Sequence, residues 1–432
     1  MSMTRDINEA DASGLTGQNG GRAELETLVR ACLARRETFL DIARRHGSPL
    51  YVIEEQTIFN RADEFIKSFE AELPDIRVFY ALKANSHPLV VEAAVKAELG
   101  LDVSSGTELR MALASGARSV VFSGPAKTED ELSLAVRNSE RVTVLLDSPV
   151  ELDRLELRAG RENVTVRAGV RLATNENGLW RKFGIHLSDL AGFMSLAEKA
   201  GHVDLRGLQF HTSWNFNPAA YVEFIGRLGS VLRSLSPETR SRMEFIDIGG
   251  GFWPCPGQWE LKPQVPGCGT ERTFLPSAPI AEFARRIGEA IRADLFPHVP
   301  CRICMEPGRW ICNDAMHLLL TVLDRKGDDI AITDGGINAV GWERFESEYF
   351  PVINLSRPEN IERPFKILGS LCTPHDVWGF SYYGSDVQPG DVLLIPSQGA
   401  YTYTLRQRFI KPLPDTVLIR PDGSLVKWRE PQ

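Results

Sequence analysis

Short apolar runs that alternate with helical stretches constrain the fold of this chain more than any other feature. The runs are rich in β-branched residues, as buried strands are, and the segments between them have helical periodicity. Eight such runs cover residues 77–82, 101–104, 120–123, 142–147, 164–172, 205–211, 245–248 and 302–306. Consecutive βα units in this number predict an α/β fold with a closed (β/α)8 barrel of the TIM type.

Polar residues or glycines end nearly every one of these runs. They are Lys83, Ser104, Ser105, Gly124, Asp147, His211, Gly249, Gly250, Gly251 and the segment 306–309. The carboxyl ends of parallel barrel strands meet at one face, where enzymes of this fold place their active sites. Structural strand ends would not need such clustering, so the pattern predicts a functional mouth at this face.

The limits of the alternating pattern divide the chain into four segments. Residues 1–22 are polar and glycine-rich and are predicted to form a disordered tail, and residues 23–54 contain a helix and a strand that join the C-terminal domain. Residues 55–312 are predicted to form the barrel, in which residues 253–273 make a long loop over the mouth. Residues 313–432 are predicted to form a mostly β domain, with strands at 318–323, 329–333, 365–371, 391–395 and 416–420.

The composition argues against several classes of function. The 432 residues carry a net charge of −8 without a basic stripe, which argues against a nucleic-acid partner. No apolar run approaches the length of a membrane span, and the N-terminus has no pattern of a secretory signal. The seven cysteines, an odd number, indicate reduced thiols and a cytoplasmic location. Cys301 and Cys304 lack the second ligand pair of a zinc site, so no metal site is predicted.

Lys83 ends the first barrel strand in the stretch Val-Phe-Tyr-Ala-Leu-Lys-Ala-Asn at residues 78–85. Ser86 and Pro88 then have the character of an N-cap and first turn of a helix over residues 90–97. Burial at this position is expected to push the Lys83 amine towards its neutral, nucleophilic form. A lysine that only extends from the strand end into solvent is the alternative, and the residue alone leaves it open.

Two further segments add chemistry to the same face. Gly249, Gly250 and Gly251 follow the seventh run, where backbone amides can close on an anion and where this barrel usually binds phosphate. Glu306 could pair with a cationic ring nitrogen and Arg309 with a phosphate or carboxylate, whereas a plain turn and a salt-bridged strand end are the structural alternatives. An amine, an anion cradle and a carboxylate together meet the needs of pyridoxal 5′-phosphate (PLP).

From about residue 50 to the C-terminus, the chain resembles the fold-type III, alanine-racemase-like PLP decarboxylases, the group of the diaminopimelate and ornithine decarboxylases. The motifs that carry the resemblance are Tyr-Ala-Leu-Lys-Ala-Asn at 80–85, Asp-Val-Ser-Ser-Gly at 102–106 with Glu108, Lys-Phe-Gly at 182–184, Gly-Gly-Gly-Phe at 249–252, Glu-Pro-Gly-Arg at 306–309, Cys372 with Asp376, and Gly-Ala-Tyr at 399–401. Several motifs in this order over most of the chain make the resemblance specific.

The resemblance implies how the cofactor is held. Lys83 would form the Schiff base with PLP, His211 would stack on the ring, and Glu306 would keep the ring nitrogen protonated. The three glycines at 249–251, Arg309 and Tyr401 would hold the phosphate.

The resemblance also implies a homodimer with shared active sites. Cys372 would reach the mouth from the partner subunit and protonate the carbanion that remains after CO₂ leaves. Arg309 and Asp376 are further expected to meet the substrate.

Several positions depart from the family pattern. Thr-Ser-Trp follows His211 where the family usually reads x-Gly-Ser, so the phosphate-binding serine is displaced and Trp214 enters the mouth. Thr373 stands where diaminopimelate decarboxylases usually carry an acid for the distal ammonium, and Trp342 where they carry an arginine for the distal carboxylate. Glu346 offers a different polar contact to the substrate.

These departures predict a decarboxylase of a non-standard amino acid from a specialised biosynthetic pathway. Two alternatives stay open: diaminopimelate decarboxylase proper, and an amino-acid racemase on the same fold. Racemases use a Lys/Tyr base pair and lack the combination of Glu-Pro-Gly-Arg with Cys-x-x-x-Asp. A regulatory homologue without activity is disfavoured because Lys83 and Cys372 are both present.

Overall fold

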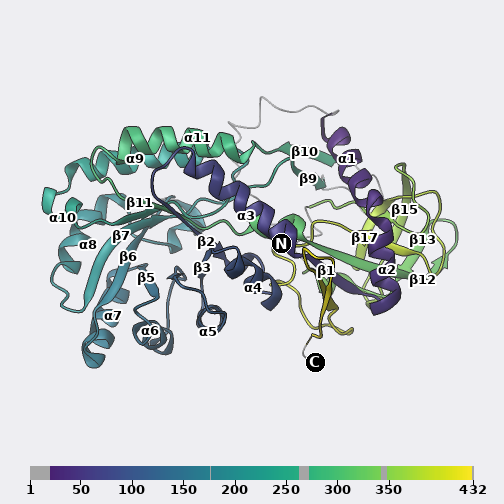
Figure 1. Cartoon of the computed structure of the whole chain (residues 1–432), viewed down its shortest axis with the longest axis horizontal. Helices are drawn as coiled ribbons and strands as arrows, with labels where there is room; N and C mark the ends of the chain where they lie inside the picture. The colour runs from purple at the N-terminus through teal and green to yellow at the C-terminus, as the bar shows by residue number, and fades with distance from the viewer. Residues whose placement is uncertain (1–19, 176, 262–271, 342–347, 431–432) are drawn as a thin grey trace.

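The computed structural model describes residues 20–175, 177–261, 272–341 and 348–430, and it shows two lobes side by side (Figure 1). The first lobe is a closed barrel of parallel strands in the order β11-β2-β3-β4-β5-β6-β7-β8. These strands are β2 (Ile76–Ala81), β3 (Gly100–Val103), β4 (Val120–Phe122), β5 (Val142–Leu146), β6 (Val166–Leu172), β7 (Val203–Phe210), β8 (Phe245–Asp247) and β11 (Arg302–Met305). Each predicted run forms one of them, which confirms the predicted barrel.

Helices cover the outside of the barrel. They are α3 (Glu55–Glu70), α4 (Pro88–Lys96), α5 (Gly106–Ala114), α6 (Glu129–Val136), α7 (Pro149–Glu162), α8 (Leu190–Ala197), α9 (Ala219–Ser234) and α11 (Ile280–Ala290). Several of these helices follow an N-cap residue whose side chain accepts a hydrogen bond from a backbone N–H of the first turn. Ser105, Thr128 and Ser148 are such N-caps. The N-cap of α4 is His87, whose side chain accepts from the Leu89 N–H, so the prediction of Ser86 was wrong.

The inside of the barrel has an apolar layer below a polar one. Phe79, Val121, Leu145, Phe245 and Cys304 form a buried cluster that fills the barrel between its strands. Such layers make a barrel a packed core rather than a pore. Charged and polar side chains therefore gather above this layer, at the carboxyl ends of the strands.

The second lobe is a nine-stranded sheet in the order β13-β15-β16-β14-β17-β12-β1-β18-β19. Its strands are β1 (Leu50–Glu54), β12 (Met316–Lys326), β13 (Ile330–Thr333), β14 (Ile353–Asn354), β15 (Glu362–Leu368), β16 (Val377–Tyr383), β17 (Val392–Ile395), β18 (Asp415–Ile419) and β19 (Leu425–Trp428). β1 lies between β12 and β18, so the N-terminal strand is part of the C-terminal sheet. The predicted β domain is confirmed, although the sequence did not predict β14, β16 or β19.

The mouth of the barrel faces this sheet. The Tyr401 N–H donates to the Ala84 carbonyl at 2.7 Å, and the Asn85 side chain donates to the Gly399 carbonyl at 2.8 Å. The segment that carries Lys83 is thereby bonded directly to the segment that carries Tyr401. The interface between the lobes is the place where the predicted site residues can meet.

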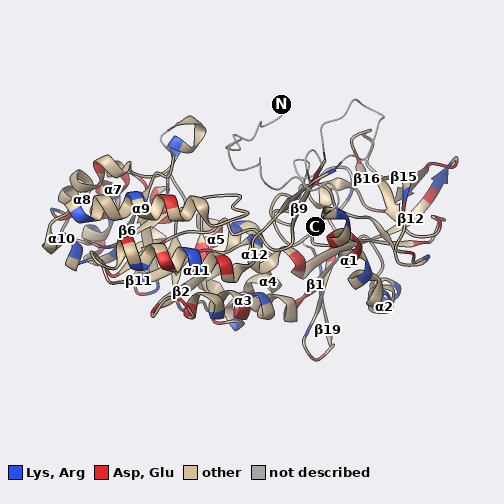
Figure 2. Cartoon of the chain, turned by 90° about the horizontal axis from the view of Figure 1, so that it is seen from above, with Lys and Arg blue, Asp and Glu red and all other residues tan. Residues whose placement is uncertain are grey.

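The N-terminal region differs from its prediction at one boundary. α1 (Gly20–Ala34) begins inside the predicted tail, and α2 (Arg36–His46) follows it. Residues 1–19 of the tail lie outside the described residues. Among the helices of the described chain, none is long and apolar enough to cross a membrane. Figure 2 shows acidic and basic residues mixed along the helices that cover the barrel, such as α9 and α11.

The predicted loop over residues 253–273 contains regular structure at its ends. β9 (Gly257–Leu261) and β10 (Arg272–Pro276) pair as an antiparallel hairpin, and residues 262–271 lie outside the described residues. The Trp259 indole donates to the Gly21 carbonyl at 2.8 Å, and Arg272 forms two hydrogen bonds of 2.6 Å with Glu362. The prediction of a plain loop was wrong for these strands because the hairpin is held by partners far away in sequence.

Candidate active site

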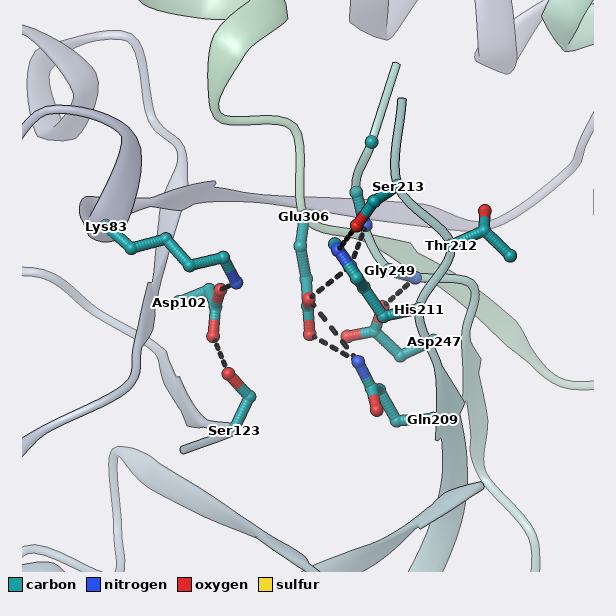
Figure 3. A network of polar contacts seen from close by, with 12 residues as sticks. Lys83, Asp102, Ser123, Gln209, His211, Thr212, Ser213, Asp247, Gly249 and Glu306 are labelled. Atoms are coloured by element: carbon teal, nitrogen blue, oxygen red, sulfur yellow. Dashed lines mark hydrogen bonds and ion pairs between the residues drawn. The ribbon is translucent and has the colours of Figure 1, made fainter. Parts of the chain in front are cut away.

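Lys83 lies in the short turn η2 (Leu82–Ala84), directly after β2, and its amine points across the mouth (Figure 3). The amine donates to Oδ2 of Asp102 on β3 at 2.9 Å. Ser123, after β4, donates to Oδ1 of the same carboxylate at 2.5 Å. Three neighbouring strand ends thus hold the lysine in one direction, and the solvent-extended alternative does not describe it.

The charge state of Lys83 differs from its prediction. Burial alone lowers the pKa of a lysine, but the Asp102 and Glu306 carboxylates outweigh burial here and raise the pKa above its ordinary value. The amine is therefore an ammonium ion in the protein without cofactor. The expectation of a neutral amine was wrong because it considered burial and not the carboxylate that β3 brings to the lysine.

Glu306 follows β11 and lies between Lys83 and His211 in the view of Figure 3. The residue is 1% exposed, and Nε2 of Gln209 on β7 lies 3.3 and 3.4 Å from its two carboxylate oxygens. Burial, together with the charges of Asp102 and Asp247, raises the pKa of Glu306 well above its usual value. This site can accept a positively charged group more readily than the open protein surface can.

His211 directly follows β7, and its two ring nitrogens make different hydrogen bonds. The Gly250 N–H donates to Nδ1 at 3.1 Å, so the proton of the neutral ring is on Nε2, which lies 3.1 Å from the Ser213 hydroxyl. Burial, and then the charges of Lys83 and Arg171, hold the pKa of His211 well below its usual value. The ring is neutral and fixed, as a stacking surface for a flat ligand should be.

The glycine turn after β8 is closely packed from beneath. A Cβ at Gly250 would lie 2.3 Å from the Glu306 carbonyl oxygen, and one at Gly251 would lie 2.1 Å from the Thr212 carbonyl oxygen. Gly251 also has a φ of +99°, which side-chain-bearing residues rarely adopt. Glycine is therefore required at both positions for the turn to pack against these carbonyls, and the backbone N–H groups of such a turn can close on an anion.

Arg309 lies at the edge of this turn between two aromatic rings. Its guanidinium carbon is 4.0 Å from the centre of the Trp253 ring and 5.1 Å from that of Tyr401. Its nearest carboxylate among the described residues is Glu348, at 3.8 Å. A planar cation held by ring faces keeps its N–H donors available for an anion.

A cavity of about 180 Å³ adjoins Arg309. Trp253, Gln258 and Glu348 line it together with Arg309, and the Gln258 side-chain oxygen is buried without a hydrogen-bond partner in the described chain. The cavity lies beside the β9–β10 hairpin and has both apolar and polar walls. Lys83, His211 and Glu306 do not line it, so the cavity lies beside the mouth and not within it.

The segment after His211 carries the departure from the family pattern. Ser213 is bonded to the histidine, and the Thr212 hydroxyl accepts from the Asn215 amide at 2.9 Å. Trp214 has a φ of +53° and is 49% exposed, and its ring meets that of Trp180 edge-on at 6.1 Å. Trp214 therefore lies at the rim of the mouth, and contact of Trp214 with a substrate stays a prediction.

Two of the site residues that were predicted in the second lobe are more exposed than Asp102 and Glu306 in the barrel. Cys372 is exposed and Thr373 half-buried in the turn between β15 and β16. The Asp376 carboxylate is buried and accepts from the Ile337 and Leu371 N–H groups at 2.8 and 2.6 Å, so it holds the turn in place. Trp342 and Glu346 lie outside the described residues.

Several residues of the mouth carried no predicted role. They are Asp102, Ser123, Arg171, Gln209 and Asp247. Asp102 and Asp247 each stand within an apolar run, where a buried carboxylate is costly unless the site uses it. That signal was present in the sequence, but nothing in the sequence showed that these residues face the same interior.

Comparison with known proteins identifies the family of the chain. The sequence model described as "Pyridoxal-dependent decarboxylase, pyridoxal binding domain" matches residues 59–313. A diaminopimelate decarboxylase of Methanothermobacter thermautotrophicus is 27% identical over 90% of this chain and 91% of its own length. An L-glutamyl-[BtrI acyl-carrier protein] decarboxylase of Niallia circulans is 26% identical over 83% of this chain and 85% of its own. The crystal structure of the M. jannaschii diaminopimelate decarboxylase with L-lysine shares the fold, with a TM-score of 0.77 at 24% identity over 90% of this chain and 91% of that one.

Proposed function

This chain belongs to the pyridoxal-dependent decarboxylases, and we propose that it decarboxylates a non-standard amino acid whose distal end differs from the zwitterion of diaminopimelate. The family consists of PLP-dependent carboxy-lyases, so the general activity and the cofactor follow from membership. The proposal for the site rests on one observation. Lys83, Glu306 and His211 lie in one layer at the mouth of the barrel, beside the glycine turn (Figure 3). The identity of the substrate and the roles of individual residues are the proposed part.

The donor set of the mouth fits PLP. Asp102, Asp247 and Glu306 are almost fully buried, and Oδ2 of Asp247 has no hydrogen-bond partner among the described residues. A cationic ring nitrogen would compensate this negative charge, and the glycine turn with Arg309 would take an anionic phosphate. Lys83 lies within the same layer, where its amine can bind the cofactor covalently.

When bound, PLP supplies an electron sink for the electron pair that remains on Cα after CO₂ leaves. His211, held neutral, would contact one face of the ring, and Glu306 would pair with the ring nitrogen. Lys83 must lose a proton before its amine can react, and the adjacent Asp102 carboxylate at 2.9 Å can accept one. A bound ring above these buried carboxylates would shield them further from water.

The proton for Cα is proposed to come from Cys372. Its thiol lies on an exposed turn of the second lobe, which supports delivery to the mouth of another subunit in a homodimer. Asp376 would position this turn through its two backbone hydrogen bonds. The exposed thiol and the odd number of cysteines also support the predicted cytoplasmic location.

The substrate proposal rests on the distal groups. A buried unpaired charge costs several kcal/mol, and Thr373 cannot neutralise a distal ammonium. The uncharged Thr373 supports a substrate whose distal end is less zwitterionic than that of diaminopimelate. The test is CO₂ release from a panel of meso-diaminopimelate, ornithine, lysine, arginine and conjugated amino acids, compared by kcat/KM.

A substrate carried as a conjugate is a second candidate. One relative is named for a glutamyl group on an acyl-carrier protein. In this chain, the rim of the mouth exposes Leu179 (89%), Trp180 (39%) and Trp214 (49%), which supports contact with a bulky substrate. Preference for a glutamyl thioester over free glutamate would favour this candidate over a free amino acid.

A further inference from the structure

The polar layer of the barrel contains more buried acids than cations. Asp102, Asp247 and Glu306 have exposed fractions of 1%, 0% and 1%. The cations that act on them are Lys83 and Arg171, and Lys83 already pairs with Asp102. Buried carboxylates without a paired charge are strongly disfavoured, so Asp247 and Glu306 need a positive charge or a proton.

Asp247 and Glu306 are held close together by one backbone unit. The Gly249 N–H donates to Oδ1 of Asp247 at 2.8 Å, and the Gly249 carbonyl accepts from the Glu306 N–H at 2.8 Å. β8 and β11, which carry the two acids, are neighbouring parallel strands. Backbone bonding and strand pairing therefore place the two residues side by side in the barrel, and the charge of Asp247 helps to raise the pKa of Glu306.

The hydrogen bonds at this pair leave acceptors without donors. Gln209 offers Glu306 only long contacts of 3.3 and 3.4 Å, and Nδ1 of His211, 3.9 Å away, already accepts from Gly250. Oδ2 of Asp247 has no partner in the described chain. A carboxyl proton is a donor, and a single proton between the acids would supply the bond that both lack.

We propose that Asp247 and Glu306 share one proton in the cofactor-free protein, and that a pyridine ring protonated on its nitrogen displaces this proton when it binds at Glu306. The inference rests on the proposed cofactor site and adds Asp247 to it as a positioning residue. The proton goes to the buffer, the ring nitrogen keeps its own proton, and Glu306 becomes the carboxylate of an ion pair. No electron transfer accompanies the exchange.

The surroundings of the pair agree with this assignment. Burial raises the pKa of Asp247 to about 7, and burial with the Asp102 and Asp247 charges raises that of Glu306 well above its usual value. The charged and titratable groups that face the pair from the packed elements are Lys83, Asp102, Arg171, His211, Tyr221 and Cys304. His211 is neutral, so none of these groups adds a positive charge beyond Lys83 and Arg171.

Infrared spectroscopy of the cofactor-free protein tests the shared proton directly. At about pH 8, above the pKa of about 7 of Asp247, an unshared Asp247 would be ionised, so wild-type protein should show the C=O band of the one buried carboxyl proton that the pair keeps. Asp247→Asn and Glu306→Gln should each lose it, whereas Asp334→Asn, in the second lobe, should keep it. The side-chain amide oxygen that Asp247→Asn introduces can still accept from the Gly249 N–H, which protects the fold. Absence of the band in wild type, or its survival in either variant, would overturn the sharing.

Calorimetry tests the displacement. The probe is pyridoxine 5′-phosphate, which has no aldehyde and so cannot react with Lys83. Titrations in buffers of different ionisation enthalpy should show release of about one proton per site from wild type and clearly less from Asp247→Asn. Equal release from both would overturn the displacement. Failure of the probe to bind would contradict the proposed cofactor site, while the infrared result on the shared proton would still stand.

Discussion

The two halves of the mouth are built in different ways. The barrel half places a half-buried Lys83 beside the buried Asp102 and Glu306, and each of these side chains has a partner on another barrel strand. The half from the second lobe places Cys372 on an exposed turn, next to a half-buried Thr373. One chain therefore completes the cofactor side, whereas the substrate side is proposed to need a partner subunit. Changes in the two halves should separate cofactor binding from turnover.

Removal of Lys83 should have the largest effect, because it should remove both the covalent link to PLP and the activity. Lys83→Ala should lose the covalent link to PLP and at least about 10⁴-fold in kcat/KM. Mass spectrometry after borohydride reduction detects the link, and CO₂ release measures activity. Lys96→Ala, which removes an exposed lysine of α4, should retain both. A reducible link in Lys83→Ala would place the attachment at another residue.

Removal of the thiol should affect only the substrate half. Cys372→Ala should lose about 10²- to 10³-fold in kcat, the usual contribution of a positioned acid, while PLP stays bound. Cys255→Ala, at another exposed cysteine, is the matched control.

Mixing of two inactive variants tests whether the active site is shared between subunits. If the site is shared, Lys83→Ala and Cys372→Ala chains together should regain activity, because a hybrid dimer contains one complete site. No recovery after verified subunit exchange would show that each chain works alone.

The distal pocket should discriminate between substrates over a similar range. Loss of a charged partner costs about 2–5 kcal/mol, so kcat/KM for meso-diaminopimelate should be roughly thirtyfold to several-thousandfold below that of the preferred substrate. Thr373→Glu should raise diaminopimelate turnover by about tenfold, and the uncharged Thr373→Gln should not. Wild-type turnover of diaminopimelate at about 10⁴ M⁻¹s⁻¹ or more would refute the distal assignment.

The contact between the lobes should affect stability and not turnover, as a pH dependence of the unfolding free energy. His87 on the barrel side donates from Nε2 to Thr416 at 3.0 Å, and burial, then Arg406, lowers its pKa to about 3. Unfolded His87 binds a proton near pH 6.5, but folded His87 does not until about pH 3. Between these values the unfolding free energy should fall by about 1.4 kcal/mol per unit of decreasing pH.

The contribution of His87 can be isolated by comparison of variants. Denaturant titrations from neutral pH downwards should show a weaker pH dependence for His87→Gln than for wild type. His298→Gln, at a histidine outside this contact, should follow wild type. Equal slopes in all three proteins would mean that other groups cause the acid sensitivity.

Local patterns in the sequence were sufficient for the architecture. Strand periodicity and helical spacing are properties of adjacent residues, so the eight barrel runs and the position of Lys83 at a strand end could be predicted. The glycine turn was predictable for the same reason, because only glycine suits its backbone. β16 was missed because Gly379 and Ser381 interrupt its apolar pattern.

Tertiary structure alone decided the charge states and partners. The sequence placed Lys83 at a strand end, but the carboxylate that keeps it protonated comes from another strand, and Coulomb energy depends on distance in space. The charge states of Asp247 and Glu306 also depend on distance in space, because the two residues are far apart in the chain and both form a hydrogen bond with Gly249. Residue types and spacing determined the barrel and its chemistry, whereas the closure of the barrel determined which groups share a charge.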